Sequence, residues 1–307
     1  NNLYKYCDII EDKPLSLEVS RVSNKNEISV TELLRHLPWQ VLDECFDLID
    51  VETLIVPKQK LDIKSKVRQG NKYESVSELT GLAIPMFFEI YKIGYMPVLE
   101  YLRECNFEEK IKMKLGNKFK KYDLDDINIF NISPEELLYL ANCWNTHKSE
   151  YLFKIHQIKE YNWLSKSSLY EGLERLKSLN ISDSSVFEDL LTLRGKPELL
   201  GKTLKGYIDC LDIDNKYLFE FKCVKELTKE HQIQSILYKY LFEQKNKFKI
   251  TVYLFNISTG ELQKINTNNA TEIVNILMKH KYTVKGPELD SIFNDRIQKI
   301  KNSYNTI

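Results

Sequence analysis

GYIDCLDIDNKYLFEFKCVKELTKEHQIQSILYKYLF, residues 206–242, contains two different hydrophobic patterns. Its apolar residues alternate as in β-strands up to residue 223, and after residue 228 they recur with helical spacing. Two carboxylates, Asp209 and Glu220, interrupt the strand-like part where core side chains are expected. The interpretation of this segment therefore depends on where these two side chains lie.

The polar pair Asp214-Asn215 is typical of a tight two-residue hairpin loop. A hairpin centred on this pair places Asp209 directly opposite Glu220, with Cβ atoms about 5 Å apart. Lys222 follows Glu220 by two residues, so it is expected on the same face. The opposite face is predicted to be apolar and to carry Ile208, Cys210, Phe219, Phe221 and Cys223.

Two like charges directly opposite each other destabilise a sheet unless a cation lies between them. Mg²⁺ or Mn²⁺ is a suitable cation, because both ions accept one or two carboxylates and keep positions for water and a substrate phosphate. A neighbouring lysine can stabilise the nucleophile or the charge that develops on the phosphorus. The pattern therefore indicates metal-assisted phosphodiester hydrolysis, with a solvent-facing polar stripe on an edge hairpin as the alternative.

The helix-like part of the segment places two further polar residues on one face. Gln234 and Tyr238 are four residues apart, so both are expected to point toward the carboxylate end of the strands. The packing stripe of the same helix is predicted to consist of Ile233, Ile236, Leu237, Tyr240 and Leu241.

Three motifs together resemble the PD-(D/E)XK nuclease superfamily, and within it the RecB and lambda-exonuclease type: Gly-x-Ile-Asp209, Glu220-Phe-Lys222 and Gln234-x-x-x-Tyr238. The resemblance implies that the aspartate and the glutamate ligate Mg²⁺ or Mn²⁺ and that the lysine assists the nucleophile. It also implies that the backbone carbonyl of Phe221 is a metal ligand and that the Gln/Tyr helix holds the substrate strand. The resemblance covers roughly residues 186–254.

The superfamily's first core helix often has a glycine followed four residues later by a metal-binding His or Glu. The segment TGLAIPMFFEIY is similar to that helix, with Gly81 in place, but Pro85 occupies the ligand position and cannot bind metal. On a helix, Glu78 and Glu89 share a stripe with Pro85, so either could supply the missing carboxylate. Glu188, in the strand-like segment VFEDLLTLR, is a third candidate.

The hydrophobic pattern predicts an α/β (α+β) fold with a small mixed β-sheet flanked by helices. The helix after residue 228 lies between two strong strands, which favours a crossover and parallel pairing. The resemblance implies a restriction-endonuclease-like core with a large helical insertion. The expected organisation is an N-terminal helical region (1–70), a nuclease-like domain (71–285) with an insertion at about 95–180, and a C-terminal helix (286–307).

Composition limits the cofactors and partners. The six cysteines form no C-x-x-C pair and the histidines show no ligand spacing, so neither an iron–sulfur cluster nor a histidine metal site is predicted. No phosphate-binding G-x-x-x-x-G-K-[ST] motif occurs, so no nucleotide cofactor is expected, and a helicase partner would lie on another chain or outside this fragment. The chain begins at Asn1 rather than Met, which indicates a fragment or a processed product.

The 44 basic and 44 acidic residues give a formal net charge of zero, so nucleic acid would have to bind at local basic patches. Two lysine-rich stretches, residues 58–72 and 110–121, are candidates. Neither a signal peptide nor a membrane span is recognisable, so a soluble intracellular protein is expected.

The leading hypothesis is a Mg²⁺- or Mn²⁺-dependent deoxyribonuclease, an exonuclease or endonuclease of DNA repair or recombination. Asp209 and Glu220 would be its metal ligands and Lys222 its electrostatic catalyst. An RNA endonuclease is a second hypothesis, because the metal chemistry does not distinguish the two sugars. A third is an inactive nuclease-like module that binds nucleic acid or a helicase, which Pro85 in the ligand position favours.

Overall fold

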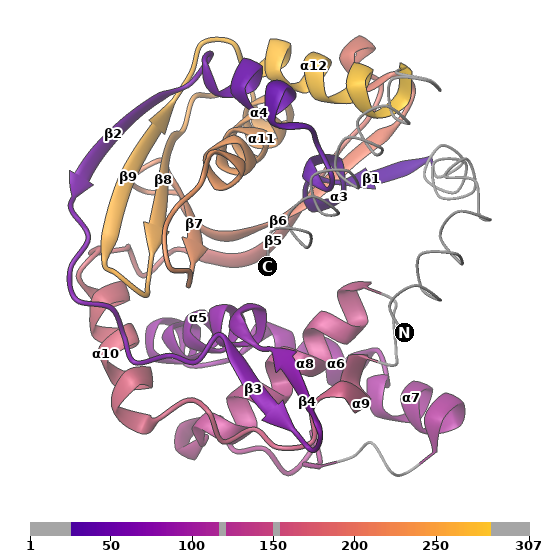
Figure 1. Ribbon diagram of the computed structural model, residues 1–307, viewed down its shortest axis with the longest axis vertical. Helices are drawn as coiled ribbons and strands as arrows, with labels where there is room; N and C mark the ends of the chain where they lie inside the picture. The colour runs from indigo at the N-terminus through magenta and orange to yellow at the C-terminus, as the bar shows by residue number, and fades with distance from the viewer. Residues whose placement is uncertain (1–25, 117–120, 150–153, 284–307) are drawn as a thin grey trace, which may run out of the picture.

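Helices cover both faces of a mixed seven-stranded β-sheet in the computed structural model, which describes residues 26–116, 121–149 and 154–283. The protein therefore has the predicted α+β fold, a mixed sheet flanked by helices (Figure 1). The sheet order is β1-β6-β7-β8-β9-β2, with β5 paired to β6. The strands are β1 (Glu27–Ser29), β2 (Asp50–Ile55), β5 (Val186–Leu193), β6 (Thr203–Asp212), β7 (Tyr217–Lys222), β8 (Thr251–Asn256) and β9 (Glu261–Asn266).

The β6–β7 hairpin has the predicted register. Its turn has Asp214 and Asn215 as the central residues, and the N–H of Lys216 closes it by donating to the carbonyl of Ile213 over 3.2 Å. The adjacent ladder pairs Cys210 with Phe219, Leu211 with Leu218 and Asp212 with Tyr217. One further step along this register brings Asp209 and Glu220 to facing positions.

Helix α11 (Lys229–Asn246) connects β7 to β8, which are parallel, so the predicted crossover is confirmed. The predicted packing stripe of α11 is buried against one face of the sheet. In Figure 1 the sheet curves around this helix. The same core also contains side chains of α3 (Val30–Leu34), α4 (Trp39–Phe46) and α12 (Ala270–Thr283).

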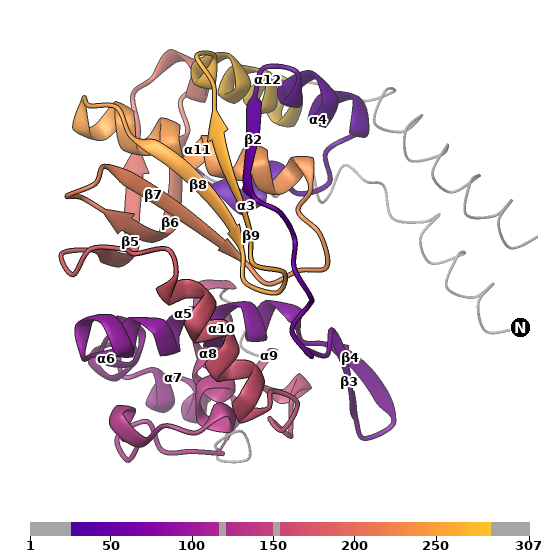
Figure 2. The same cartoon turned by 90° about the vertical axis from the view of Figure 1, so that its left-hand side faces the viewer.

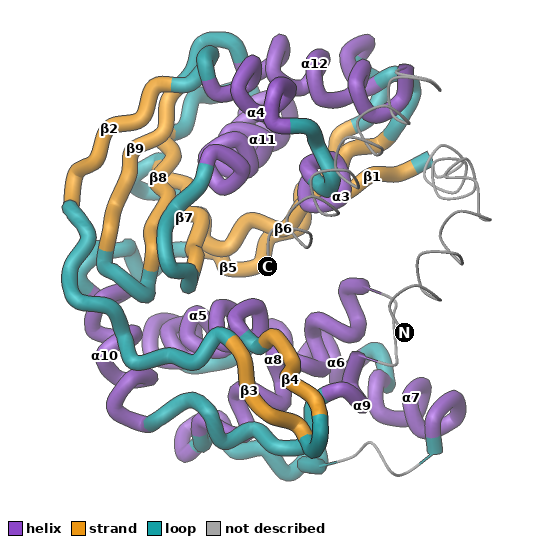
Figure 3. The backbone as a smooth tube through the Cα atoms, in the orientation of Figure 1, coloured by secondary structure: helices purple, strands orange, loops and turns teal. Residues whose placement is uncertain are grey.

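The described residues between 77 and 177 form a lobe of helices, the helical lobe, against the other face of the sheet (Figure 3). Buried Cys210, Phe219, Phe221 and Cys223 from the sheet share one core with these helices. A hairpin of β3 (Lys66–Gln69) and β4 (Lys72–Ser75) projects beside the lobe (Figure 2). The helices are α5 (Ser77–Ile93), α6 (Pro97–Glu104), α7 (Phe107–Leu115), α8 (Pro134–Ser149), α9 (Lys154–Gln157) and α10 (Lys166–Lys177).

Two details differ from the sequence-based expectations. Residues 26–70 contain the expected helices α3 and α4, but they also contribute strands β1 and β2 to the large sheet, so this segment is not simply helical. Ile208 packs in the core beneath α11, whereas Cys210 packs in the core of the helical lobe, so the two do not share a face. The limits of the predicted domains stay predictions, and the expected helix at 286–307 lies outside the described residues.

The cysteines of the described residues are free thiols, and four of the five are buried: Cys45, Cys143, Cys210 and Cys223. In the described part of the chain, no single helix is both long and apolar enough to cross a membrane. Helices α5 and α6 meet those criteria only as a pair, which is bent by 101°.

Candidate active site

Three carboxylates from three neighbouring strands form a row across the sheet. Glu188 on β5 lies between two residues that pair with Cys210 and Ile208 of β6, so it stands opposite Asp209. Glu220 on β7 follows the residue that pairs with Cys210, so it stands at the other side of Asp209. We call Glu188, Asp209 and Glu220 the carboxylate row.

The strands diverge at the centre of this row. The β6–β7 ladder ends at Cys210, and one step beyond it the N–H of Phe221 donates to Oδ2 of Asp209 over 2.7 Å. On β5, Glu188 adopts φ = 51°, the left-handed region that non-glycine residues rarely occupy. This irregularity coincides with the change of face between Ile208 and Cys210, and explains why strict alternation gave the wrong side for Ile208.

Glu220 is buried and paired with Lys222. The glutamate is 2% exposed, and Nζ of Lys222 donates to its Oε1 over 2.6 Å. Its other oxygen, Oε2, has no hydrogen-bond partner among the described residues. The alternative of a solvent-facing polar stripe is therefore wrong, because the side chain of Glu220 does not face solvent: it is buried and forms an ion pair with Lys222.

Burial dominates the electrostatics of two members of the row, Asp209 and Glu220. It raises the pKa of Asp209 well above 3.8, and the charge of Glu220 adds to this effect. Burial also raises the pKa of Glu220 above 4.5, although the Lys222 ammonium opposes it. Burial alone would lower the pKa of Lys222, but the charges of Glu220 and Asp209 outweigh it and raise the pKa. Lys222 is thus held as a cation beside carboxylates that are costly to ionise.

Helix α5 adds a fourth carboxylate. Glu89 is 1% exposed, and its Oε2 has no partner among the described residues. Burial raises the pKa of Glu89, and the charges of Glu188 and Asp209 raise it further, so this side chain lies within electrostatic reach of the row. The helix continues through Pro85, which lacks an N–H donor, and presents Glu89 one turn later.

The positions of Glu78, Glu89 and Glu188 in the structure show which of these three candidates for the missing carboxylate lie near Asp209. Glu89 and Glu188 interact electrostatically with Asp209, as required of a shared site. Glu78 lies in the first turn of α5, is exposed, and forms an ion pair of 3.8 Å with Lys154. The structure brings Glu89 and Glu188 to the row and places Glu78 in a different environment.

Gln234 and Tyr238 lie together as predicted. Nε2 of Gln234 donates to the hydroxyl of Tyr238 over 3.2 Å. Burial raises the pKa of Tyr238, and the charges of Glu220 and Asp209 raise it further. Tyr238 on α11 therefore lies within electrostatic reach of the carboxylate row.

Gly206 makes the position of Tyr238 possible, and its role was not predicted. A Cβ on Gly206 would lie 2.5 Å from Cε1 of Tyr238 and 3.0 Å from Cγ2 of Val30. A lone glycine within a strand pattern often marks such a close approach, which is the signal that sequence reasoning could have used. Lys148 of α8, 3.4 Å from Oε2 of Glu188, was also missed, because nothing in the sequence connects the end of that helix to β5.

We expect Gly206→Ala to destabilise the protein by about 1–3 kcal/mol, because the added methyl group overpacks against the buried tyrosine. Gly81→Ala is the matched control: its Cβ would meet only Cβ of Cys223, at 3.6 Å, which is an ordinary contact. Because Gly81 is inside α5, that change should stabilise the helix by about 0.5–1 kcal/mol. Chemical denaturation measures both variants, and equal unfolding free energies for the two would contradict the close approach.

The donor set of the site fits a hard divalent cation. Its groups are carboxylate oxygens, which Mg²⁺ and Mn²⁺ prefer, and two of them, Oε2 of Glu89 and Oε2 of Glu220, are buried without partners in the described residues. Within residues 26–116, 121–149 and 154–283, however, no group of three or more His, Cys, Asp or Glu side chains is positioned to hold a metal ion. In this structure Lys222 and Lys148 neutralise two of the carboxylates instead.

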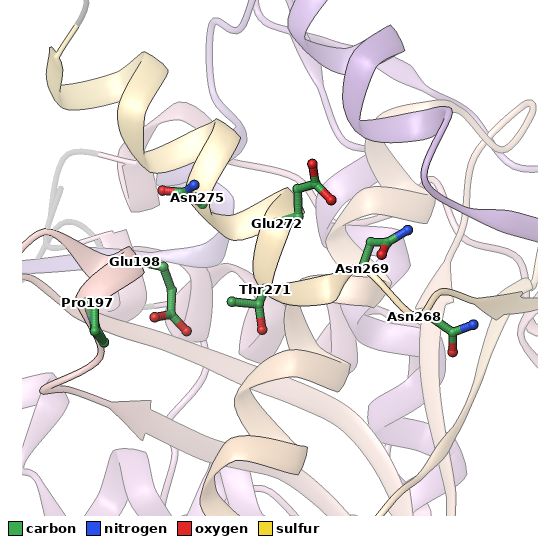
Figure 4. Close-up of a pocket in the computed structure, with 7 residues that line it drawn as sticks. All are labelled: Pro197, Glu198, Asn268, Asn269, Thr271, Glu272 and Asn275. Carbon is green, nitrogen blue, oxygen red and sulfur yellow. The ribbon is translucent and has the colours of Figure 1, made fainter.

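A separate open hollow of about 620 Å³ lies beside the start of α12 and the short helix η3 (Pro197–Leu199) (Figure 4). None of its lining residues belongs to the carboxylate row. Its lining consists of Pro197, Glu198, Asn268, Asn269, Thr271, Glu272 and Asn275.

No protein-family model matches the sequence, and no curated protein matches it. Among solved structures, one similar chain is a putative exonuclease from Eubacterium rectale, which is 13% identical. The similarity covers 72% of this chain and 95% of that chain, with a TM-score of 0.27. A similarity at this level carries no argument about function, so the functional assignment rests on the residues of the site.

Proposed function

We propose that this protein is a Mg²⁺- or Mn²⁺-dependent deoxyribonuclease of the PD-(D/E)XK type. The observation that carries the proposal is the position of Lys222: its ammonium is 2.6 Å from a buried carboxylate in a row that also contains Asp209. Carboxylates that can bind a divalent cation, beside a lysine that can stabilise developing negative charge, fit metal-assisted phosphodiester hydrolysis. The order of these residues on two strands, with Gln234 and Tyr238 on the following helix, supports the same assignment.

Each residue has a definite role in this proposal. Asp209, Glu220 and the carbonyl of Phe221 would hold the divalent cation, with Glu89 or Glu188 in place of the ligand that Pro85 cannot supply. A cation bound there supplies Lewis-acid activation of water and of the phosphodiester. Lys222, kept protonated by its neighbours, stabilises the negative charge that develops at phosphorus.

The substrate strand would be positioned by α11 and by exposed basic side chains. Gln234 and the hydroxyl of Tyr238 are hydrogen-bonded to each other and can orient a phosphate or a sugar oxygen. Basic residues of the two lysine-rich stretches are exposed on the linker and the β3–β4 hairpin (58–72) and on α7 (from 110 onward). Lysines on an exposed arm can contact the DNA backbone without reading its sequence.

The test is a cleavage assay with Mn²⁺ on circular and linear DNA, each in single- and double-stranded form, and on an RNA strand of matched sequence. Cleavage of at least one DNA form, abolished by a chelator, is the expected result. Cleavage of RNA alone would replace the proposal with the RNA endonuclease. Products from linear but not circular DNA would identify an exonuclease.

A second candidate, an inactive nuclease-like module that binds nucleic acid or a helicase, is favoured by one observation. No group of three potential ligands in the described residues is already spaced for a metal ion. Calorimetric titration with Mn²⁺ separates the two candidates. The nuclease predicts Mn²⁺ binding that Asp209→Asn weakens at least about tenfold, whereas the inactive module predicts no binding that depends on Asp209.

A further inference from the structure

Lys148, in the last turn of α8, reaches the carboxylate row from the helical lobe. Its Nζ lies 3.4 Å from Oε2 of Glu188, and Glu188 is the one carboxylate within ion-pair distance of it in the described part of the chain. The side chains of Lys148 and Glu188 are 28% and 11% exposed. The ammonium therefore stands at the boundary between the buried carboxylates and solvent.

Two aromatic rings hold this ammonium in place. Nζ of Lys148 lies 5.1 Å from the ring centre of Trp144, one turn earlier on α8, and 5.3 Å from that of Tyr207, which precedes Asp209 by two residues on β6. The two rings contact each other edge to face, with centres 5.8 Å apart. Aromatic faces attract a cation without occupying its N–H groups. Lys148 thus contacts one ring of its own helix, α8, and one ring of β6.

A lysine ammonium has three N–H donors, and within the described residues one hydrogen bond from Lys148 is found, to Glu188. Lys222 also donates one hydrogen bond in the described residues, but its bond is shorter, 2.6 Å, and goes to the more deeply buried Glu220. Both ammonium groups therefore have donors beyond these bonds, and Lys148, whose side chain is 28% exposed against 18% for Lys222, is the one more accessible to a ligand that approaches from solvent.

Glu188 cannot serve Lys148 and a divalent cation equally well. A divalent cation held by Asp209 and Glu220 with Glu188 as the further ligand would repel the ammonium and compete with it for Glu188, because like charges a few ångströms apart are strongly unfavourable away from bulk water. If Glu188 turned to such a cation, Lys148 would lose its ion-pair partner while the two rings would still hold it beside the site. A phosphate oxygen is a suitable new partner for a compact lysine charge.

We propose that Lys148 is a phosphate-binding residue of this site, held by Glu188 until a divalent cation binds and then transferred to a non-bridging oxygen of the DNA backbone. This inference rests on the proposed function. It assigns to the helical lobe a direct part in substrate binding, and it makes metal binding a precondition for strong DNA binding.

The test uses Lys148→Met, which keeps an apolar side chain of similar length between the two rings. The matched control is Lys177→Met on α10, because Lys177 has the same two kinds of contact, an ion pair of 2.7 Å with Glu174 and a ring centre, that of Tyr91, at 4.7 Å. Mn²⁺ affinity is measured by calorimetry without DNA. Binding of a labelled phosphorothioate DNA strand, which resists hydrolysis, is measured by fluorescence anisotropy with Mn²⁺ present.

Lys148→Met should bind Mn²⁺ about 3- to 10-fold more tightly, because the competitor for Glu188 is gone. The same variant should bind DNA about 10-fold more weakly. Lys148→Arg should retain most of the DNA binding, and Lys177→Met should change neither quantity.

Two results would overturn the proposal. Weaker Mn²⁺ binding in Lys148→Met would mean that the lysine merely orders Glu188, and unchanged DNA binding would mean that it does not contact phosphate. Because neither measurement depends on cleavage, a protein that binds Mn²⁺ and DNA but cuts neither DNA nor RNA would refute the proposed nuclease while still testing Lys148.

Discussion

Glu220→Gln should lower Mn²⁺-dependent DNA cleavage by about 10³-fold or more. The change removes the charge of the carboxylate that both contacts Lys222 and supplies a predicted metal ligand, so two sources of transition-state stabilisation are lost together. Initial cleavage rates at saturating Mn²⁺ measure the effect, and circular dichroism checks that the variant is folded.

The control for this variant is Glu226→Gln. Glu226 is exposed and lies four residues beyond Lys222, so the same chemical change occurs nearby without touching the row. Its cleavage rate should match that of the unchanged protein. Activity of Glu220→Gln within about tenfold of that of Glu226→Gln would contradict the assignment of Glu220.

Glu89→Gln should have opposite effects on stability and on metal binding. In the absence of metal, it should raise the free energy of unfolding at pH 8 by about 1–3 kcal/mol, because it removes a buried charge whose Oε2 has no partner in the described residues. It should weaken Mn²⁺ binding, because the same carboxylate is a predicted ligand. Functional sites often contain groups, such as buried charges, that lower the stability of the folded protein but are needed for activity.

The stability gain should depend on pH in a defined direction. The pKa of Glu89 in the folded protein is raised above 4.5, so the folded state holds this proton more tightly than the unfolded chain does. Stability from this group is therefore complete below about pH 4.5 and is lost as the pH rises through the folded pKa. The difference in unfolding free energy between Glu89→Gln and the unchanged protein should be small at pH 5 and larger at pH 8.

Glu78→Gln is the matched control, since Glu78 lies on the same helix but is exposed and paired with Lys154. Its unfolding free energy should stay within about 0.5 kcal/mol of that of the unchanged protein at both pH values. A pH-independent difference for Glu89→Gln would show that Glu89 is not the buried, proton-binding group described here. Denaturant titration at the two pH values provides both measurements.

The parts of the site that could be predicted from sequence are those set by local geometry. The register that leads Asp209 and Glu220 to facing positions follows from a four-residue turn, and the alignment of Gln234 with Tyr238 follows from helical periodicity. Neither depends on how distant parts of the chain pack. The same locality explains why Lys222 could be placed beside Glu220 correctly.

The remaining groups arrive through tertiary packing, which no spacing in the sequence reveals. Glu89 comes from α5 and Lys148 from α8, both separated from β6 by long stretches of chain, so the choice among Glu78, Glu89 and Glu188 had to stay open. The change of face at Asp209 was missed because alternation assumes a regular strand, whereas Glu188 on the paired strand has a left-handed backbone. The β5–β6 ladder is interrupted at Glu188 and the β6–β7 ladder ends before Asp209, as expected where function competes with an ideal sheet.

The most direct test is the Mn²⁺-dependent cleavage of a labelled DNA strand by the unchanged protein and by Asp209→Asn, measured side by side. Asp209 is the centre of the carboxylate row and accepts the N–H of Phe221, so its replacement keeps the shape of the site and removes its central charge. We predict metal-dependent cleavage by the unchanged protein and a loss of about 10³-fold or more in the variant. Equal cleavage by the two proteins, or none by the unchanged protein on any DNA substrate, would contradict the account.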